Sequence, residues 1–247
     1  MMEDSQKAED FWLFGYGSLI WKPPPHFDER VPGYIEGYVR RFWQARYLSY
    51  HTASIKTNTQ DHRGTPEAPG RVATLIDRAH WETLTDHHNA PAERVWGAAY
   101  HIPSSHAAEV RDYLDIREIN GYSIQYTPFH PAPTAENANP SPIHCMVYIG
   151  LPENDQFVGP QDPQALAEHI LKSRGPSGEN KEYLYMLETA LLGLSEESGD
   201  DHITDLVRRC REIEARAAGS LTAERDQHFG SKLHQVGSTE EQEEVEK

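Results

Sequence analysis

Residues 14–25 read FGYGSLIWKPPP, which places two glycines and a serine after the apolar run at 11–14 and three prolines shortly behind them. The apolar run predicts a strand, and the glycines after it predict a loop whose backbone is not covered by side chains. The prolines prevent a helix from following directly. A dinucleotide-binding fingerprint is excluded, because its third glycine would fall at Ile20 and its helix is missing. A serine-hydrolase elbow is excluded as well, because Tyr16 and Ile20 stand where glycines would flank Ser18.

What remains is a turn with exposed backbone donors. The amides of Gly17, Ser18 and Leu19 can converge on an anion or on a developing oxyanion, with the Ser18 hydroxyl as a further donor. The alternative is a tight turn that only ends the strand. The motif alone leaves both interpretations open.

The composition is that of a globular, acidic protein. Of the 247 residues, 37% are hydrophobic and 10% aromatic, which is enough for one sizeable core. A formal net charge of −16 argues against binding to nucleic acid or to an anionic membrane. Two cysteines and a polar amino-terminal stretch, without an apolar run of membrane-spanning length, predict a cytoplasmic protein with no disulfide framework. The oligomeric state is left open.

Short β-branched and aromatic runs predict about six strands. They lie at 11–16, 34–38, 71–76, 95–102, 122–127 and 143–149. The spacing of apolar residues predicts four helices. The first is capped by Ser104 or Ser105, the second starts at Asp162, the third follows Ser177 and the fourth includes 203–213. Consecutive strands with helices late in the chain predict an α+β fold.

Apolar residues are sparse at both ends of the chain, so the burial of apolar surface there is too small to offset the conformational entropy lost on ordering. We expect a flexible N-terminal tail at 1–9, one folded domain at 10–221 and a flexible acidic C-terminal tail at 222–247.

A carboxylate interrupts the apolar stripe of the helix expected before residue 120. Val110, Leu114 and Glu118 follow one another at a spacing of four residues, so Glu118 stands where a core residue is expected. Partial burial and the negative end of the helix dipole would both raise its pKa toward the range of a general acid or base. The alternative is an ion pair with Arg117 or a solvated helix end.

Other polar residues give weaker signals. The 14 histidines show no HExxH motif and no paired CxxC, so we expect surface histidines and no metal site. Arg63 and Arg71 lie at either end of a polar loop, where each could pair with a substrate carboxylate or with a structural one.

A series of motifs follows in order along most of the chain: GYGSLIWKP (15–23), GYVRRFWQ (37–44), HRGTP (62–66), PGRVATL (69–75), YLDIREINGY (113–122), VYIG (147–150), VGP (158–160) and GPSGENKEYL (175–184). Together they resemble the ChaC-type γ-glutamylcyclotransferases, most closely the glutathione-specific fungal members. One departure is the segment ARYLSYHTASIKTNTQ (45–60), which is longer than the family pattern.

The resemblance implies a γ-glutamylcyclotransferase-like fold, a small closed β-barrel with flanking helices, for a catalytic domain at 10–221. It implies cleavage of glutathione to 5-oxoproline and cysteinylglycine without a cofactor. Glu118 would be the acid/base, and Arg63 and Tyr148 occupy positions associated with substrate binding. The γ-glutamyl-binding loop would comprise Phe14, Gly15, Tyr16, Gly17, Ser18 and Leu19. The alternatives are a γ-glutamyl amide hydrolase or amidotransferase and a non-catalytic γ-glutamyl-binding module.

Overall fold

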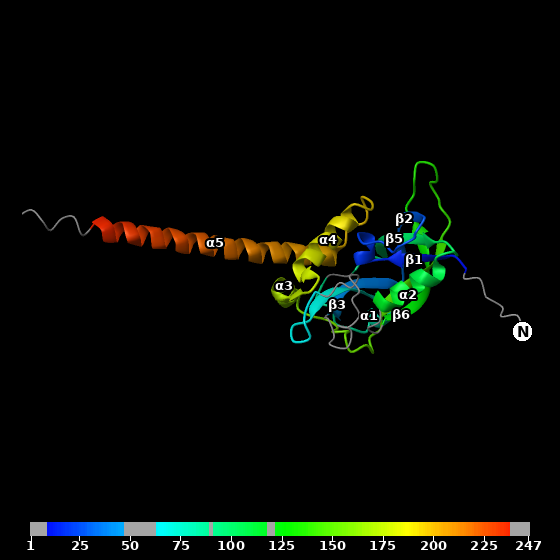
Figure 1. Ribbon diagram of the computed structural model, residues 1–247, viewed down its shortest axis with the longest axis horizontal. Helices are drawn as coiled ribbons and strands as arrows, with labels where there is room; N and C mark the ends of the chain where they lie inside the picture. The colour runs from blue at the N-terminus through cyan, green and yellow to red at the C-terminus, as the bar shows by residue number, and fades with distance from the viewer. Residues whose placement is uncertain (1–8, 47–62, 89–90, 118–121, 238–247) are drawn as a thin grey trace, which may run out of the picture.

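In the residues that it describes, the computed structural model has nine strands, five α-helices and one 3-10 turn (Figure 1). The structure describes residues 9–46, 63–88, 91–117 and 122–237. In chain order the elements are β1 (Phe11–Gly15), the 3-10 turn η1 (Ser18–Ile20), β2 (Glu29–Glu36), β3 (Tyr38–Arg46), β4 (Gly70–Asp77), α1 (Arg78–Trp81), β5 (Arg94–Ile102), α2 (Ala107–Arg117), β6 (Tyr122–Pro131), β7 (Ile143–Gly150), α3 (Pro163–Lys172), β8 (Arg174–Gly175), β9 (Gly178–Glu179), α4 (Asn180–Leu192) and α5 (Asp201–Gly237).

Five strands close into a barrel in the order β1-β5-β2-β6-β7, with β7 returning to β1. Neighbouring strands run antiparallel except at the closure, where Trp12 lies opposite Cys145 and Leu13 opposite Met146 in parallel register. Closure pairs the barrel strands on both sides, so the barrel has no open edge. The predicted α+β fold with a small closed barrel and flanking helices is confirmed, with five strands in the barrel.

Two aromatic rings fill the middle of the barrel, and two glycines make room for them. Phe14 and Phe129 are buried with their ring centroids 5.6 Å apart. A Cβ atom on Gly33 would lie 2.5 Å from the Phe129 ring, and one on Gly97 would lie 2.6 Å from the Phe14 ring. Gly33 and Gly97 are opposite each other in the β2–β5 ladder. Any side chain at these positions would displace a ring from the core.

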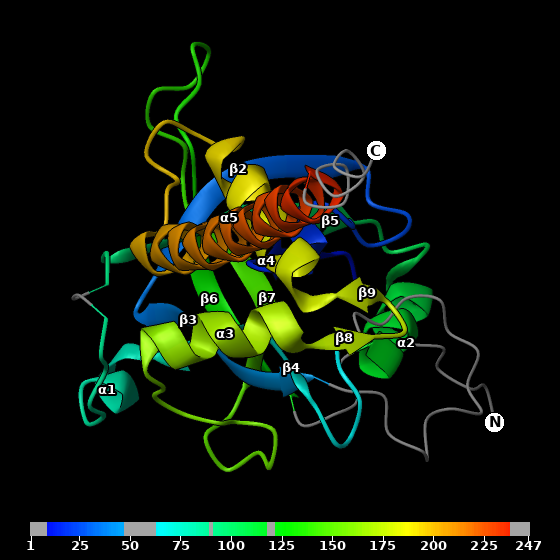
Figure 2. The same ribbon diagram turned by 90° about the vertical axis from the view of Figure 1, so that its left-hand side faces the viewer.

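A separate two-stranded sheet of β3 and β4 lies beside the barrel, and every residue of β3 is buried. Helices α3, α4 and α5 cover it, and Figure 2 shows them in front of the strands. The sequence analysis did not identify β3 and assigned 34–38 to a single strand. That assignment is wrong, because the chain turns at Gly37, which has a φ of +84°, and separates β2 from β3. A positive φ is readily adopted by glycine alone.

The helix starts depend on side-chain caps. Asp162 caps α3 as expected, because its carboxylate accepts a hydrogen bond from the Ala165 N–H (2.9 Å). The expected start of α4 after Ser177 is wrong by two residues. Its cap is Glu179, and the Glu179 and Glu182 side chains form a reciprocal capping box. The short β8–β9 hairpin precedes this cap.

Helix α5 runs away from the rest of the molecule (Figure 1). Its first turns pack against α3 and α4, where Ile203, Leu206 and Cys210 are fully buried. It continues to Gly237 and therefore crosses residue 221, the proposed end of the folded domain; the domain boundaries stay a prediction. Within the described ranges, no helix combines the length and the apolar character needed to cross a membrane.

Candidate active site

The glycine motif forms a tight turn at the end of β1. Strand β1 stops at Gly15, and η1 closes through hydrogen bonds from the Ile20 N–H to the Gly17 carbonyl (3.0 Å) and from the Lys22 N–H to the Ser18 carbonyl (2.8 Å). These bonds start from amides later in the chain than those of Gly17, Ser18 and Leu19. The amides of Ile20 and Lys22 thus close the turn.

A buried tyrosine of β5 fixes the far side of this turn. The Tyr100 hydroxyl donates to the Leu19 carbonyl (2.7 Å), and the Arg30 Nε donates to the same hydroxyl (3.3 Å). The turn also folds back closely over β1, because a Cβ atom on Gly15 would lie 2.6 Å from the Leu19 Cβ. Glycine at position 15 is thus required by close packing.

Helix α4 contributes a second tyrosine to the turn. Tyr183 is buried, and its hydroxyl oxygen lies 2.9 Å from the position that a Cβ atom on Gly17 would occupy. The Trp21 ring contacts the Tyr183 ring edge-on, with centroids 5.3 Å apart. The sequence analysis identified Tyr183 only as part of an apolar helix face, since a helical pattern does not show what a hydroxyl will meet.

Tyr148 lies on β7, the strand parallel to β1. The β1–β7 register pairs Trp12 with Cys145 and Leu13 with Met146, two residues before Tyr148. Tyr148 is buried in one cluster with Leu13, and Leu19 packs against that cluster. The structure therefore brings the predicted residues Gly15, Leu19 and Tyr148 together.

Phe14 takes a different position from the rest of the loop. Its ring is 1% exposed and fills the barrel core, so its side chain is a packing element. Tyr16 is also buried, in the same cluster. Any contribution of Phe14 to ligand binding would come from its backbone at the end of β1.

Arg63 joins the chain before β4 to the start of α4. It is 2% exposed and donates through Nη1 to the Glu179 carbonyl (3.1 Å) and to the Glu182 carboxylate (3.2 Å). Arg71, the other candidate arginine, donates through Nε to Gln161 (3.2 Å). Both arginines therefore have structural contacts, and those of Arg63 hold the helix that carries Tyr183.

Two hydrogen bonds of Asn180 fix the start of α4 to the β3–β4 sheet. The Asn180 side chain accepts from the Arg71 N–H (2.7 Å) and donates to the Arg71 carbonyl (2.6 Å). This pair of hydrogen bonds imitates a strand partner for the edge of β4. Because Asn180 is fully buried, the bonds are protected from water and fix the position of the first turn of α4.

Glu118 lies outside the described residues, but the helix before it does not. On α2, Val110 and Leu114 are fully buried and belong to the same cluster as Tyr148 and Leu13. The apolar face predicted for this helix is therefore confirmed, and it packs on the part of the barrel that carries Tyr148.

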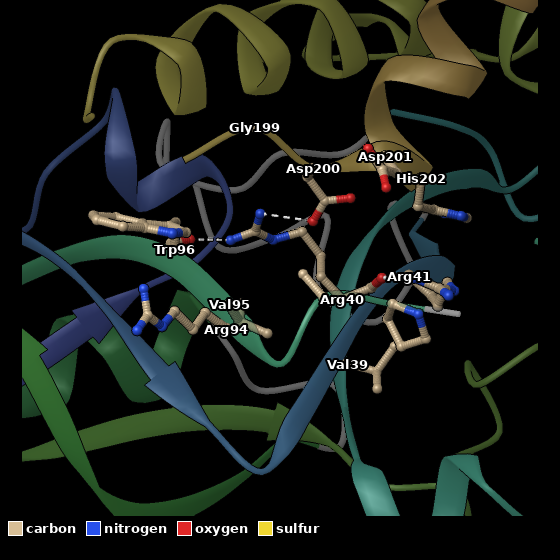
Figure 3. A pocket seen from close by; sticks show the side chains of 12 residues that line it. Val39, Arg40, Arg41, Arg94, Val95, Trp96, Gly199, Asp200, Asp201 and His202 are labelled. Atoms are coloured by element: carbon tan, nitrogen blue, oxygen red, sulfur yellow. Dashed lines mark hydrogen bonds and ion pairs between the residues drawn. The ribbon is translucent and has the colours of Figure 1, made fainter. Parts of the chain in front are cut away.

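Figure 3 shows a buried arginine of β3 for which the sequence carries no signal. Arg40 is 2% exposed, and its guanidinium donates to Asp200 (3.0 Å) and to the Trp96 carbonyl. Burial lowers the pKa of Arg40, while Asp200 and then the nearby Tyr183 and Tyr16 hydroxyls counteract that change. Asp200 thus supplies the main compensation for the buried charge of Arg40.

The pocket in Figure 3 is lined by Arg40, Asp200 and His202 and has a volume of about 30 Å³. This is room for a water molecule or two and too little for a peptide-sized ligand. We therefore assign the pocket a structural role, separate from the turn at 15–20.

Two buried histidines extend this polar cluster to the surface. The Phe42 N–H donates to His202 Nε2 (3.0 Å), which makes that nitrogen an acceptor. Neutral His202 then carries its proton on Nδ1, 3.1 Å from the Nδ1 of His88, and the Nε2 of His88 lies 3.1 Å from Asp205. The sequence places His88 in a polar loop and shows no sign of this contact with α5.

Comparison with known proteins gives one consistent family. The sequence model of the family described as ChaC-like protein matches residues 11–213. The chain is 41% identical over 203 residues to a protein of Schizosaccharomyces pombe named glutathione-specific gamma-glutamylcyclotransferase, covering 81% of this chain and 92% of that one. A protein of Saccharomyces cerevisiae with the same name is 38% identical over 223 residues, covering 78% and 90%.

A solved structure gives the same result at the level of the fold. The crystal structure of a selenomethionine-labelled γ-glutamyl cyclotransferase specific to glutathione from yeast superposes with a TM-score of 0.71 at 35% identity. The superposition covers 83% of this chain and 96% of that one.

Proposed function

This chain belongs to the family of ChaC-like proteins, and on that basis we propose that it is a glutathione-specific γ-glutamylcyclotransferase. It converts glutathione to 5-oxoproline and cysteinylglycine. The observation that carries the proposal is the match to the Schizosaccharomyces pombe enzyme, at 41% identity over 92% of its length. We also propose that glutathione is its substrate and that it acts in the cytoplasm.

The reaction needs no nucleophile from the protein. The α-amine of the γ-glutamyl group attacks its own γ-carbonyl carbon, so a C–N bond forms within a five-membered ring and the bond to the cysteine nitrogen breaks. One proton leaves the attacking amine and one joins the departing amine. A single general acid/base can make both transfers, and we propose Glu118 for this role.

The turn at 15–20 suits the remaining requirement, which is to hold negative charge. The amides of Gly17, Ser18 and Leu19 are the proposed donors to the substrate α-carboxylate or to the tetrahedral oxyanion. Support comes from the rigidity of the turn, because the Tyr100 hydroxyl fixes the Leu19 carbonyl at 2.7 Å. Donors held in place in advance stabilise a developing charge better than donors that must reorient.

Tyr148 and Arg63 are the other proposed substrate-binding residues. The position of Tyr148 beside the turn supports its role. The contacts of Arg63 with Glu179 and Glu182 support an additional positioning role, because they hold the first turn of α4. Tyr183, on that helix, packs against Gly17 and joins the proposed site.

The test is to incubate the purified protein with glutathione and identify the products by mass spectrometry. We expect 5-oxoproline and cysteinylglycine in equal amounts. Glutamate with cysteinylglycine would instead identify a hydrolase, and transfer of the glutamyl group to an added amine an amidotransferase. Unchanged glutathione would identify a binding module. The Glu118→Gln variant is the control for a contaminating activity.

A further inference from the structure

Three side chains with metal-binding donor atoms meet on the surface near the start of α2. His26 follows the proline run, His106 directly precedes α2, and Glu109 lies in the first turn of that helix. Their donor atoms all lie within 4.8 Å of one another. Two segments that are distant in the sequence are thus joined by two imidazoles and one carboxylate.

Two of the separations between these donors are close to the spacing of ligands around a tetrahedral metal ion. His26 Nε2 lies 3.2 Å from one oxygen of Glu109, and His106 Nδ1 lies 3.4 Å from the other. Zinc binds nitrogen and oxygen ligands at about 2.0–2.1 Å, so two ligands of one tetrahedral ion are about 3.3–3.4 Å apart. Both histidines are hydrogen-bonded to Glu109 in the structure, and a bound cation would replace these hydrogen bonds with metal–ligand bonds.

We propose that His26, His106 and Glu109 form a binding site for one divalent transition-metal cation, with zinc as the preferred ion. Two imidazoles and a carboxylate are a ligand set that zinc uses, whereas magnesium and calcium prefer oxygen ligands alone. The net charge of −16 adds a general attraction for cations. The set also revises the expectation that none of the histidines forms a metal site.

The exposure of the side chains is consistent with an accessible site. The side chains of His26, His106 and Glu109 are 39%, 41% and 64% exposed. A cation can therefore enter from solvent, and water can complete its coordination. The two rings are stacked almost parallel, with centroids 4.1 Å apart. Binding requires the rings to turn toward a common point, which partly exposed side chains can do by rotation about their side-chain bonds.

The site would connect the chain after the glycine turn to α2. His26 has a φ of 60°, the one positive φ at a residue other than glycine in the described part of the chain. A cation shared with His106 would stabilise this left-handed conformation and hold the segment against the helix. Thermal stability would rise with cation concentration, because the folded form binds the ion and the unfolded chain has no preformed site.

The experiment uses the full-length protein with any affinity tag removed and zinc chloride as the probe. Calorimetric titration measures the dissociation constant of the wild type and of the variants His26→Ala and Glu109→Gln. The matched control is His144→Ala, which removes an exposed histidine of β7 outside the cluster. We expect one zinc site in the wild type and in the control, and binding at least about tenfold weaker in the two variants.

A zinc-soaked crystal gives an independent readout. Anomalous scattering at the zinc edge is expected to show one peak in contact with all three side chains. Equal zinc binding by the wild type and His26→Ala would overturn the proposal, as would a zinc peak held by other residues. Thermal unfolding without zinc checks that the variants are folded, so a loss of binding is not a loss of structure.

Discussion

The hydroxyl oxygen of Tyr183 lies 2.9 Å from the position that a Cβ atom on Gly17 would occupy. Gly17 has a φ of −128°, outside the left-handed region, and a side chain there would come too close to the Tyr183 hydroxyl. Gly17→Val is therefore expected to lower kcat/KM by at least about tenfold, because the branched side chain must displace Tyr183 or the turn. Steady-state kinetics of the folded variant check this.

Ser18→Ala is the matched variant at the next position, and we expect it to lose less activity. It removes one hydroxyl, with an effect of about 0.5–3 kcal/mol, and leaves the backbone amides in place. A covalent γ-glutamyl adduct on Ser18 in mass spectra would contradict the mechanism. So would an inactive alanine variant beside an unharmed valine variant.

The contact between Gly17 and Tyr183 can be isolated by a double-mutant cycle. Gly17→Ala alone should lower kcat/KM, because its Cβ meets the Tyr183 hydroxyl. In the Tyr183→Phe background the hydroxyl is gone, so the same substitution should cost clearly less. Kinetics of the four proteins give the interaction energy. Strictly additive effects would show that the hydroxyl is not what constrains residue 17.

Glu118→Gln tests the proposed acid/base. Glutamine keeps the size of the side chain but does not accept the proton of the attacking amine. We expect a folded protein with kcat reduced by about a thousandfold or more. Circular dichroism and thermal unfolding serve as controls for the fold. Retention of a tenth of the wild-type kcat by the folded variant would reject the assignment.

The buried histidines predict a dependence of stability on pH. Burial lowers the pKa of His202 well below its ordinary value, and the positive charges of Arg41 and Arg40 and the neighbouring His88 lower it further. Burial also lowers the pKa of His88, which Asp205 partly counteracts.

The unfolded chain protonates both histidines as the pH falls through 6.5, whereas in the folded protein the protonation of His88 is shifted to lower pH and that of His202 to well below 6.5. The free energy of unfolding should therefore fall as the pH drops below 6.5, by about 1.4 kcal/mol per pH unit for a histidine kept neutral. Denaturant unfolding at pH 7.5, 6.5 and 5.5 measures it. His202→Gln is the comparison, because its amide oxygen can still accept from the Phe42 N–H.

The wild type should lose more stability than His202→Gln over this range. His101 acts in the opposite direction, since its hydrogen bonds with Asp10 and Asp28 raise its pKa, but both proteins contain it. Parallel stability curves for the two proteins would refute the role of His202.

The sequence predicted the barrel strands β1, β5, β6 and β7 because each is a short apolar run in the sequence, but it located only the end of β2. Strand β3 escaped prediction, since its arginines contradict the pattern of a buried strand. Arg40 can be buried only because Asp200, far along the chain, supplies its partner. Such a pair is visible only after folding.

The candidate site, like the fold, was predicted only in part from the sequence. The glycine turn and Tyr148 stand in recognisable motifs, and Leu19 of the turn packs against the cluster that contains Tyr148. The contacts of Tyr183 with Gly17 and of Tyr100 with Leu19 depend on how α4 and β5 pack against the turn. Their residue types are equally common in cores, so the sequence gives no separate signal for them.

The β3–β4 ladder pairs residues from Tyr38 with Asp77 out to Arg46 with Gly70. The pairing of the two strands and the helices that cover them hold this ladder together. Its stability therefore does not require a fixed length of the connection between Arg46 and Gly70. Each doubling of a loop costs only about 0.6 kcal/mol in closure entropy. A longer or shorter connection between these two strands would therefore change the free energy of unfolding only slightly.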